Sequence, residues 1–151
     1  MPCFAPADIW NTQFSPARIG QEAAGTVEAI GDGVAGFAIG DKVSTMPGFS
    51  MNRYGVYGEE TIIPAAMTVT HPNSLSWEHA AAIWMPYMTA YGALVDTALL
   101  TPGDAVIITA ASSSVGLAAL QIANAAGAVS IATTRTSAKR GALLSHGAHH
   151  V

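Results

Sequence analysis

A serine-rich turn at residues 109–116 has the composition and position of a phosphate-binding loop. It follows the apolar run 105–110 and precedes the helical pattern 115–126, so the sequence predicts a turn between a strand and a helix. Unpaired N–H groups at a helix N-terminus attract an anion, and small residues allow a pyrophosphate to approach the backbone. The turn is therefore a candidate dinucleotide site.

The same turn departs from the strict G-x-G-x-x-G pattern, because Gly116 is its only glycine. Gly116 suits the third role in that pattern, which is close packing of the helix against the strand. Ser113 and Ser114 stand where small residues let phosphate approach, and their hydroxyls can donate hydrogen bonds. An ordinary serine-rich connection remains the alternative.

Cations and hydroxyls are concentrated in residues 133–140. Four of these eight positions are Thr or Ser, and Arg135, Lys139 and Arg140 make up half of the six Lys and Arg residues of the chain. The acidic residue that binds the ribose 2′-hydroxyl in NAD sites is absent from this segment. A 2′-phosphate is the natural counter-charge, so the segment predicts NADPH in preference to NADH. The alternative is a solvated basic helix start, although cations are locally unfavourable at a helix N-terminus.

Two β-rich runs and two helical patterns position these segments. The runs 105–110 and 129–133 flank the helical pattern 115–126, and a second helical pattern follows at 137–146. This order predicts a right-handed β-α-β unit with a parallel sheet.

Glycines recur every few residues between positions 20 and 69, with β-branched residues between them. This pattern predicts short antiparallel strands and tight turns. Segments 26–30 and 42–45 are expected to be neighbouring strands of a small barrel or curled sheet, with a turn at Gly40 and Asp41.

Residues 76–100 change to a helical pattern. Ser76 is the expected N-cap, and Glu78 in the first turn favours the helix dipole. Pro86 interrupts the pattern, so two helices are expected, the second beginning at about residues 88–89.

Composition excludes several classes of protein. The chain has 151 residues and a net charge of −4, and 11% of its residues are charged. It is too apolar for a disordered tail, and it lacks the large basic cluster of a nucleic-acid-binding protein. Its apolar runs are shorter than the roughly 18 residues that cross a bilayer, and the N-terminus lacks a secretory signal. The single cysteine, Cys3, cannot form an internal disulfide, so a cytoplasmic location is expected, without a membrane or nucleic-acid partner.

Several spaced motifs, taken together, resemble the medium-chain dehydrogenase/reductase superfamily, and its zinc-independent quinone oxidoreductase branch is the most similar variant. The catalytic-domain motif is carried by Gly20, Glu22, Gly25, Thr26, Ile30, Gly31, Phe37, Gly40, Asp41 and Val43. Cofactor-domain motifs follow at 80–82, 89–94, 103–104 and the turn before Gly116.

This resemblance implies two partial domains. A GroES-like β-barrel-type catalytic domain lacking its N-terminal strands is expected over 1–75. The first part of a Rossmann dinucleotide-binding domain, an α/β fold with a doubly wound parallel sheet, is expected over 76–151. The chain is accordingly expected to be a central fragment of a longer protein.

The resemblance also implies where NADPH would bind. Thr89 is expected near the nicotinamide, and Thr134, Arg135 and Lys139 near the 2′-phosphate. The residues expected near the pyrophosphate are Ala111, Ser112, Ser113, Ser114 and Val115.

No catalytic metal is expected from the resemblance, because Ala5, Gln21 and Met85 stand at the positions of zinc ligands and none of them is a competent ligand. Without a Lewis acid, an acceptor that delocalises its own negative charge is favoured over a simple alcohol. We therefore expect hydride transfer from NADPH to a small quinone, enone or related carbonyl compound, in a homodimer.

Tyr54 and Tyr57 are the catalytic candidates, because their hydroxyls could donate a proton to a substrate oxygen from a loop expected to border the cleft. Packing or rim positions are the alternative for both. Two other functions remain open: an NADPH-binding protein without turnover, and an interaction fragment that associates through exposed apolar strands.

Overall fold

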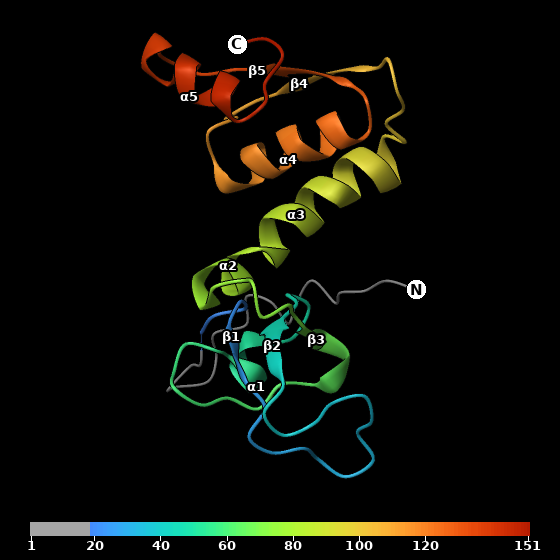
Figure 1. Ribbon diagram of the computed structural model, residues 1–151, viewed down its shortest axis with the longest axis vertical. Coiled ribbons are helices and arrows are strands. Elements are labelled where there is room, and N and C mark those ends of the chain that lie inside the picture. The colour runs from blue at the N-terminus through green and yellow to red at the C-terminus, as the bar shows by residue number, and fades with distance from the viewer. Residues whose placement is uncertain (1–18) are drawn as a thin grey trace. The chain divides into compact units, whose positions relative to one another are not determined.

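The computed structural model describes residues 19–151, so Cys3 and Ala5 lie outside the described residues. The chain divides into two compact units between Trp84 and Met85 (Figure 1). The expected boundary between a catalytic and a cofactor-binding domain is at 75/76, and that functional assignment stays a prediction.

The first unit contains a three-stranded antiparallel sheet in the order β1-β2-β3. Its strands are β1 (Ala24–Thr26), β2 (Lys42–Thr45) and β3 (Thr68–Thr70), and Gly25 lies opposite Val43. The expected pairing between the first two segments is therefore confirmed.

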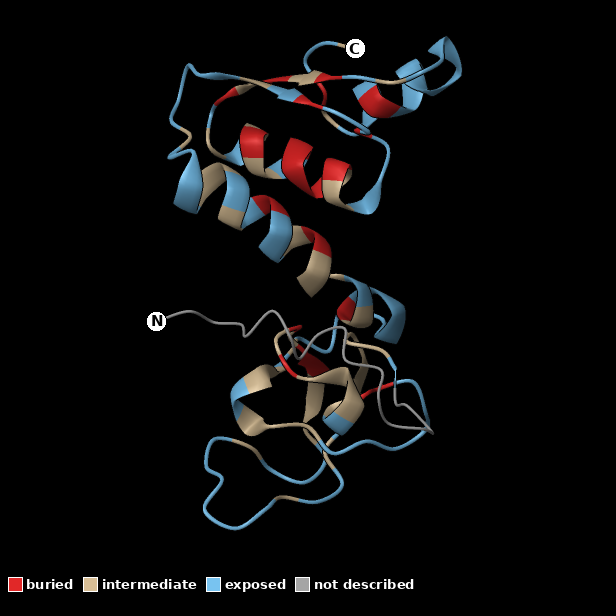
Figure 2. Cartoon of the chain, turned by 180° about the vertical axis from the view of Figure 1, so that it is seen from behind, coloured by how far each residue is buried: buried red, intermediate tan, exposed pale blue. Residues whose placement is uncertain are grey.

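The predicted extent of the first strand, 26–30, is wrong, because β1 ends at Thr26. The Val27 N–H still donates to the Asp41 carbonyl at 3.0 Å, but the following loop is mostly exposed (Figure 2). The Asp41 carboxylate accepts the Ala38 N–H at 2.8 Å, and Gly40 has a φ of 93°. These hydrogen bonds close a loop that includes residues 27–30, where the β-branched residues predicted a longer strand.

Short helices complete the first unit: α1 (Met51–Tyr54), η1 (Ala65–Met67) and α2 (Trp77–Ala82). Ser76 caps α2 as predicted, since its hydroxyl accepts the His79 N–H at 3.3 Å.

Pro86 does not separate two helices as predicted. The break falls at Ile83, and α3 (Trp84–Tyr91) begins before the proline, so a helix start at 88–89 is wrong. Pro86 lies in the first turn of α3, where a backbone N–H has no intrahelical partner and its loss costs little. The chain continues from α3 into a π-helix, η2 (Gly92–Thr97).

The second unit contains the predicted β-α-β arrangement. Its elements are β4 (Ala105–Ile108), α4 (Ser114–Ala125), β5 (Val129–Ala132), η3 (Ser137–Lys139) and α5 (Arg140–Ser145). β4 and β5 are parallel, with Ile107 opposite Ile131, and His150 forms a parallel bridge to Ile131. The parallel sheet is therefore confirmed.

The core of the second unit lies between α4 and the two strands. Leu120 and Ala123 on α4 are fully buried, and Ile108, Ala132 and Leu143 are buried with them (Figure 2). This packing holds the turn between β4 and α4 in place. Among residues 19–151, the structure has no helix long and apolar enough to span a bilayer.

Candidate functional site

The turn between β4 and α4 is tightly constrained. Ala110 has a φ of 48°, which is unusual for a residue with a Cβ, and its carbonyl accepts the Ser113 N–H at 2.8 Å. The Ala111 N–H donates to the Thr133 carbonyl at 3.4 Å, which ties the turn to the end of β5. Backbone strain of this kind often marks a functional loop.

Gly116 allows α4 to pack directly on this turn. A Cβ added at Gly116 would lie 2.7 Å from the Ala110 carbonyl oxygen and 2.7 Å from the Ala111 backbone. No other residue type fits without a backbone shift, so the predicted packing role of Gly116 is confirmed.

Two backbone donors at the N-terminus of α4 have no acceptor in the described part of the chain. The Ser113 hydroxyl accepts the Gly116 N–H at 3.1 Å, and the Ser113 carbonyl accepts the Leu117 N–H at 2.9 Å. The amide N–H groups of Ser114 and Val115 meet no acceptor from residues 19–151. With the helix dipole behind them, these two donors can bind an anion.

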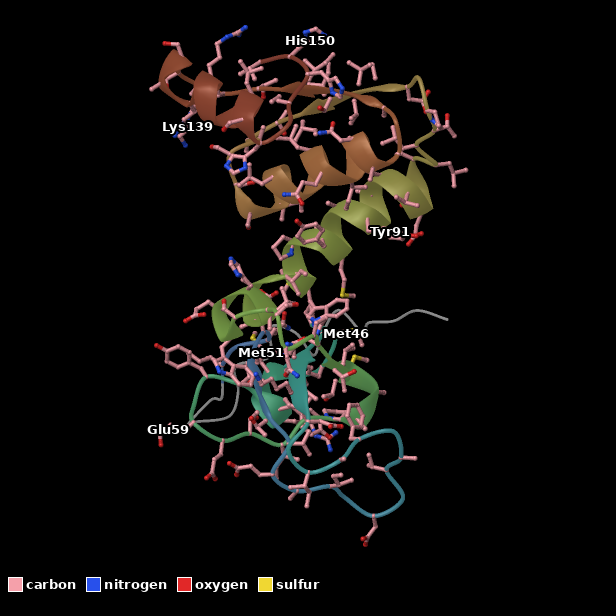
Figure 3. The ribbon with its side chains drawn as sticks, in the orientation of Figure 1. Met46, Met51, Glu59, Tyr91, Lys139 and His150 are labelled. Carbon is pink, nitrogen blue, oxygen red and sulfur yellow. The ribbon has the colours of Figure 1, made fainter. Side chains whose placement is uncertain are left out.

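The cation-rich segment 133–140 contacts the same turn. Lys139, labelled in Figure 3, lies on η3. Its Nζ donates to the Ser112 hydroxyl at 3.0 Å. Arg135 is exposed and Thr134 is half-buried in the loop that leads from β5 to η3. Arg140 is directed elsewhere, because its guanidinium donates to the Val151 carbonyl. The structure therefore joins the two predicted phosphate-binding segments through Ser112 and Lys139.

Thr89 lies on α3, in the same unit as the turn. Its hydroxyl donates to the Met85 carbonyl at 2.6 Å, which leaves its oxygen lone pairs able to accept. Tyr87 on the same helix donates to Gln121 Oε1 on α4 at 2.5 Å, so α3 is tied to α4. Thr89 is itself exposed.

Tyr54 and Tyr57 belong to the first unit and have different surroundings. The Tyr54 ring packs edge-on against Phe49, with centroids 6.5 Å apart, and the Arg53 guanidinium lies 5.3 Å from its centre. Tyr57 is 85% exposed, although its backbone N–H donates to the Ile19 carbonyl at 2.9 Å. Packing therefore fixes the ring of Tyr54 but not that of Tyr57.

Gln21 and Met85, two of the three positions that correspond to zinc ligands, lie within the described residues. Gln21 precedes β1, and its carbonyl accepts the Thr45 hydroxyl at 3.1 Å, while Met85 lies in the first turn of α3. Within residues 19–151, no three His, Cys, Asp or Glu side chains gather closely enough to hold a metal ion.

Two features of the turn were not predicted from the sequence. The sequence does not indicate that Ala110 has a positive φ, because glycine or asparagine is the usual residue in that conformation. The contact between Ser112 and Lys139 joins residues 27 positions apart and depends on how η3 follows β5. The clustering of cations after β5 was the one available signal.

Comparison with known proteins identifies relatives of both units. Residues 4–73 match the family of alcohol dehydrogenase GroES-like domains. The chain is 36% identical over 135 residues to the synaptic vesicle membrane protein VAT-1 homolog of Rattus norvegicus, covering 89% of this chain and 32% of that protein. It is 38% identical over 136 residues to the quinone oxidoreductase of Homo sapiens, covering 90% of this chain and 40% of that protein.

A solved structure agrees with these relatives. The quinone oxidoreductase of Escherichia coli, complexed with NADPH, superposes with a TM-score of 0.80 at 32% identity, covering 96% of this chain and 43% of that one. The chain thus spans between 32% and 40% of the length of the two curated relatives named above. The GroES-like match, the parallel β-α-β unit and these relatives agree: the chain belongs to the medium-chain dehydrogenase/reductase superfamily, in its quinone oxidoreductase-like group.

Proposed function

We propose that the chain is part of an NADPH-dependent oxidoreductase that transfers a hydride to a quinone, an enone or a related carbonyl compound without catalytic zinc. One arrangement carries the proposal: the N–H groups of Ser114 and Val115, which meet no acceptor among the described residues, lie at the turn that Lys139 also reaches. A nicotinamide dinucleotide with a 2′-phosphate presents anions that suit both features.

The residues of the turn fit such a cofactor. Gly116 removes the side chain that would push α4 away from the turn, and Ala111 is fully buried beneath it. The backbone can therefore approach a pyrophosphate closely. The residues that would hold the pyrophosphate are Ala111, Ser112, Ser113, Ser114 and Val115.

The remaining proposed contacts are with the 2′-phosphate and the nicotinamide. Thr134, Arg135 and Lys139 would hold the 2′-phosphate, because they supply a hydroxyl and two cations after β5, and Lys139 contacts the turn. Thr89 would lie near the nicotinamide, where its hydroxyl oxygen can accept a hydrogen bond. When bound, the reduced nicotinamide supplies the hydride.

The choice of acceptor rests on chemistry. Gln21 and Met85 offer no zinc-binding group, so an acceptor that spreads its own negative charge is favoured. Tyr54 is the better placed proton donor of the two tyrosines, since packing on Phe49 fixes its ring. The names of the human and Escherichia coli relatives, both quinone oxidoreductases, support a quinone as the first acceptor to test.

A binding titration tests the cofactor. We expect NADPH to bind the chain at least tenfold more tightly than NADH, and this preference to disappear in R135A/K139A. The matched control is R53A/K42A, which removes the same charge from the first unit and should keep the preference. Equal affinity for both cofactors in the unaltered chain would refute NADPH specificity.

Turnover of the complete protein that contains this chain tests the reaction. NADPH oxidation by a quinone or an enone should proceed after treatment with a metal chelator, and Tyr54→Phe should lower kcat by at least about tenfold. Tyr57→Phe should have the smaller effect, because the Tyr57 ring is exposed. NADPH binding without turnover of any such acceptor would identify a non-catalytic nucleotide-binding protein instead.

The proposal includes a homodimer as the working form of the complete protein. Light scattering on that protein should give twice the mass of one chain, and a monomer active at the same concentration would exclude this assembly.

A further inference from the structure

The hydrogen bond between Lys139 and Ser112 joins two parts of the proposed cofactor site. Lys139 Nζ lies 3.0 Å from Ser112 Oγ, across 27 positions of sequence, and Lys139 is labelled in Figure 3. The ammonium has three N–H donors, so two remain for another acceptor when Ser112 takes one. A lysine held in this way can bind a phosphate without leaving the serine.

Ser112 is a firm anchor for a flexible side chain. Its neighbour Ala111 is fully buried, and its other neighbour Ser113 caps α4 and donates its N–H to the Ala110 carbonyl at 2.8 Å. The backbone that carries the Ser112 hydroxyl is therefore held in place. Lysine side chains otherwise have large rotamer freedom, which a single anchor reduces before any ligand binds.

The other two cations of residues 133–140 make no hydrogen bond to the turn within residues 19–151. Arg140 is directed to the carbonyl of Val151, and the side chain of Arg135 makes no hydrogen bond to residues 19–151. Lys139 is thus the cation whose position depends on the turn itself.

We propose that Ser112 is a specificity-determining positioning residue: its hydroxyl holds Lys139 beside the turn, so that the ammonium is already oriented toward a phosphate on the adenosine ribose. This inference rests on the proposed function. Ser112 acts through Lys139, so removing its hydroxyl weakens discrimination between the two cofactors more than it weakens cofactor binding in general.

A double-mutant cycle tests this role. The ratio of the NADH Kd to the NADPH Kd is measured for the unaltered chain, S112A, K139M and S112A/K139M. S112A should lower the ratio about threefold, since it removes one exposed charge-assisted hydrogen bond. S112A should not change the ratio further when K139M is already present, and S112T should restore it.

The matched control is S145A. Ser145 is exposed on α5, and its hydroxyl donates to the Ala142 carbonyl at 2.8 Å, away from any cation of the site. This variant should leave the ratio unchanged. An S112A effect that is equal for both cofactors, or that persists in the K139M background, would overturn the inference.

Side-chain NMR supplies a measurement without cofactor. Lys42 and Lys139 are the two lysines of the sequence, so 15N-lysine labelling gives two ammonium signals. Lys42 Nζ lies 5.0 Å from the centre of the Trp77 ring and serves as the internal reference. S112A should shift the Lys139 signal and leave that of Lys42 in place; an unmoved Lys139 signal would exclude the contact in solution.

The two proposals fail in different ways. If the unaltered chain prefers NADPH but S112A keeps the same ratio, the role of Ser112 is wrong and the proposed function stands. If the unaltered chain binds neither cofactor, the proposed function fails, and the specificity role of Ser112 fails with it.

Discussion

Gly116 faces the carbonyl of Ala110 so closely that a Cβ added to the glycine would lie 2.7 Å from that oxygen. Backbone atoms on the other side of this contact cannot move without opening the turn between β4 and α4. Gly116→Ala should therefore lower the free energy of unfolding by about 2 kcal/mol and weaken NADPH binding. Urea denaturation and the cofactor titration measure the two effects.

Gly141→Ala is the matched control for this substitution. Gly141 lies in α5, and a Cβ there would meet nothing within 4 Å. The alanine should stabilise the chain by about 0.5 kcal/mol, because it restricts the unfolded chain. If the two variants had equal stability, the close packing at Gly116 would be disproved.

A hydrogen-bonded group around Ser130 holds the end of the chain against β5. The Ser130 hydroxyl is fully buried and donates to Asn124 Oδ1 at 3.1 Å, and Asn124 Nδ2 donates to the Gly147 carbonyl at 2.8 Å. Asn124→Ala removes both contacts and should lower the free energy of unfolding by about 2 kcal/mol.

The same substitution should have a local signature. The N–H groups of His149 and His150 both donate to the Ser130 carbonyl at 3.1 Å, so their hydrogen exchange should accelerate in N124A. N73A, at an exposed turn position, is the control for losing an asparagine. Unchanged exchange at these two amides would show that Asn124 does not hold this segment.

Trp84 stabilises the first unit through its indole N–H, which donates to Ser44 Oγ at 2.8 Å. Ser44 is 1% exposed, so Trp84→Phe leaves its hydroxyl without this partner in a site that water does not reach. We expect a loss of about 1–3 kcal/mol in the free energy of unfolding. Trp77→Phe should cost less, since Trp77 is 43% exposed. Equal losses for the two variants would contradict the role of this hydrogen bond.

Lowering the pH should decrease the stability of the second unit, because Asp104 becomes protonated. The Thr101 N–H and the Thr101 hydroxyl each donate to Asp104 Oδ2 at 2.8 Å, and these bonds, the backbone one first, lower the pKa of Asp104 below its ordinary value. A carboxylate with a lowered folded-state pKa contributes stability above its unfolded pKa, and this contribution is lost as the pH falls through the folded value.

Asp104→Asn should therefore flatten the decrease in stability below about pH 4. Urea midpoints measured from neutral to acidic pH give the comparison. Asp96→Asn is the control, because the Asp96 carboxylate accepts no hydrogen bond from residues 19–151. If the urea midpoint fell equally steeply at acidic pH in D104N and in the unaltered chain, Asp104 would not make this contribution.

Much of the second unit could be predicted from the sequence, because local chemistry determines it. The apolar run before the serine-rich turn became β4, the helical pattern became α4, and Gly127 after that helix has a φ of 74°, which favours glycine. Ser76 capped α2 as expected, since a cap requires only residues three positions apart.

Two errors concern where elements begin and end. Pro86 predicts a helix break, but it lies in the first turn of α3, where proline is tolerated. Residues 27–30 continue the predicted strand pattern, but β1 ends at Thr26, and the loop that follows closes at Gly40 and Asp41.

The sequence by itself determined the β-α-β order of the second unit, the packing role of Gly116 and the family to which the chain belongs. These depend on residue type and short spacing. Tertiary structure alone decided that Ala110 adopts a positive φ, that the N–H groups of Ser114 and Val115 meet no acceptor within residues 19–151, and that Lys139 reaches Ser112. The physical reason is that these features depend on the packing of α4 against the strands and on the position of η3 after β5. Both are set by contacts between residues far apart in the chain.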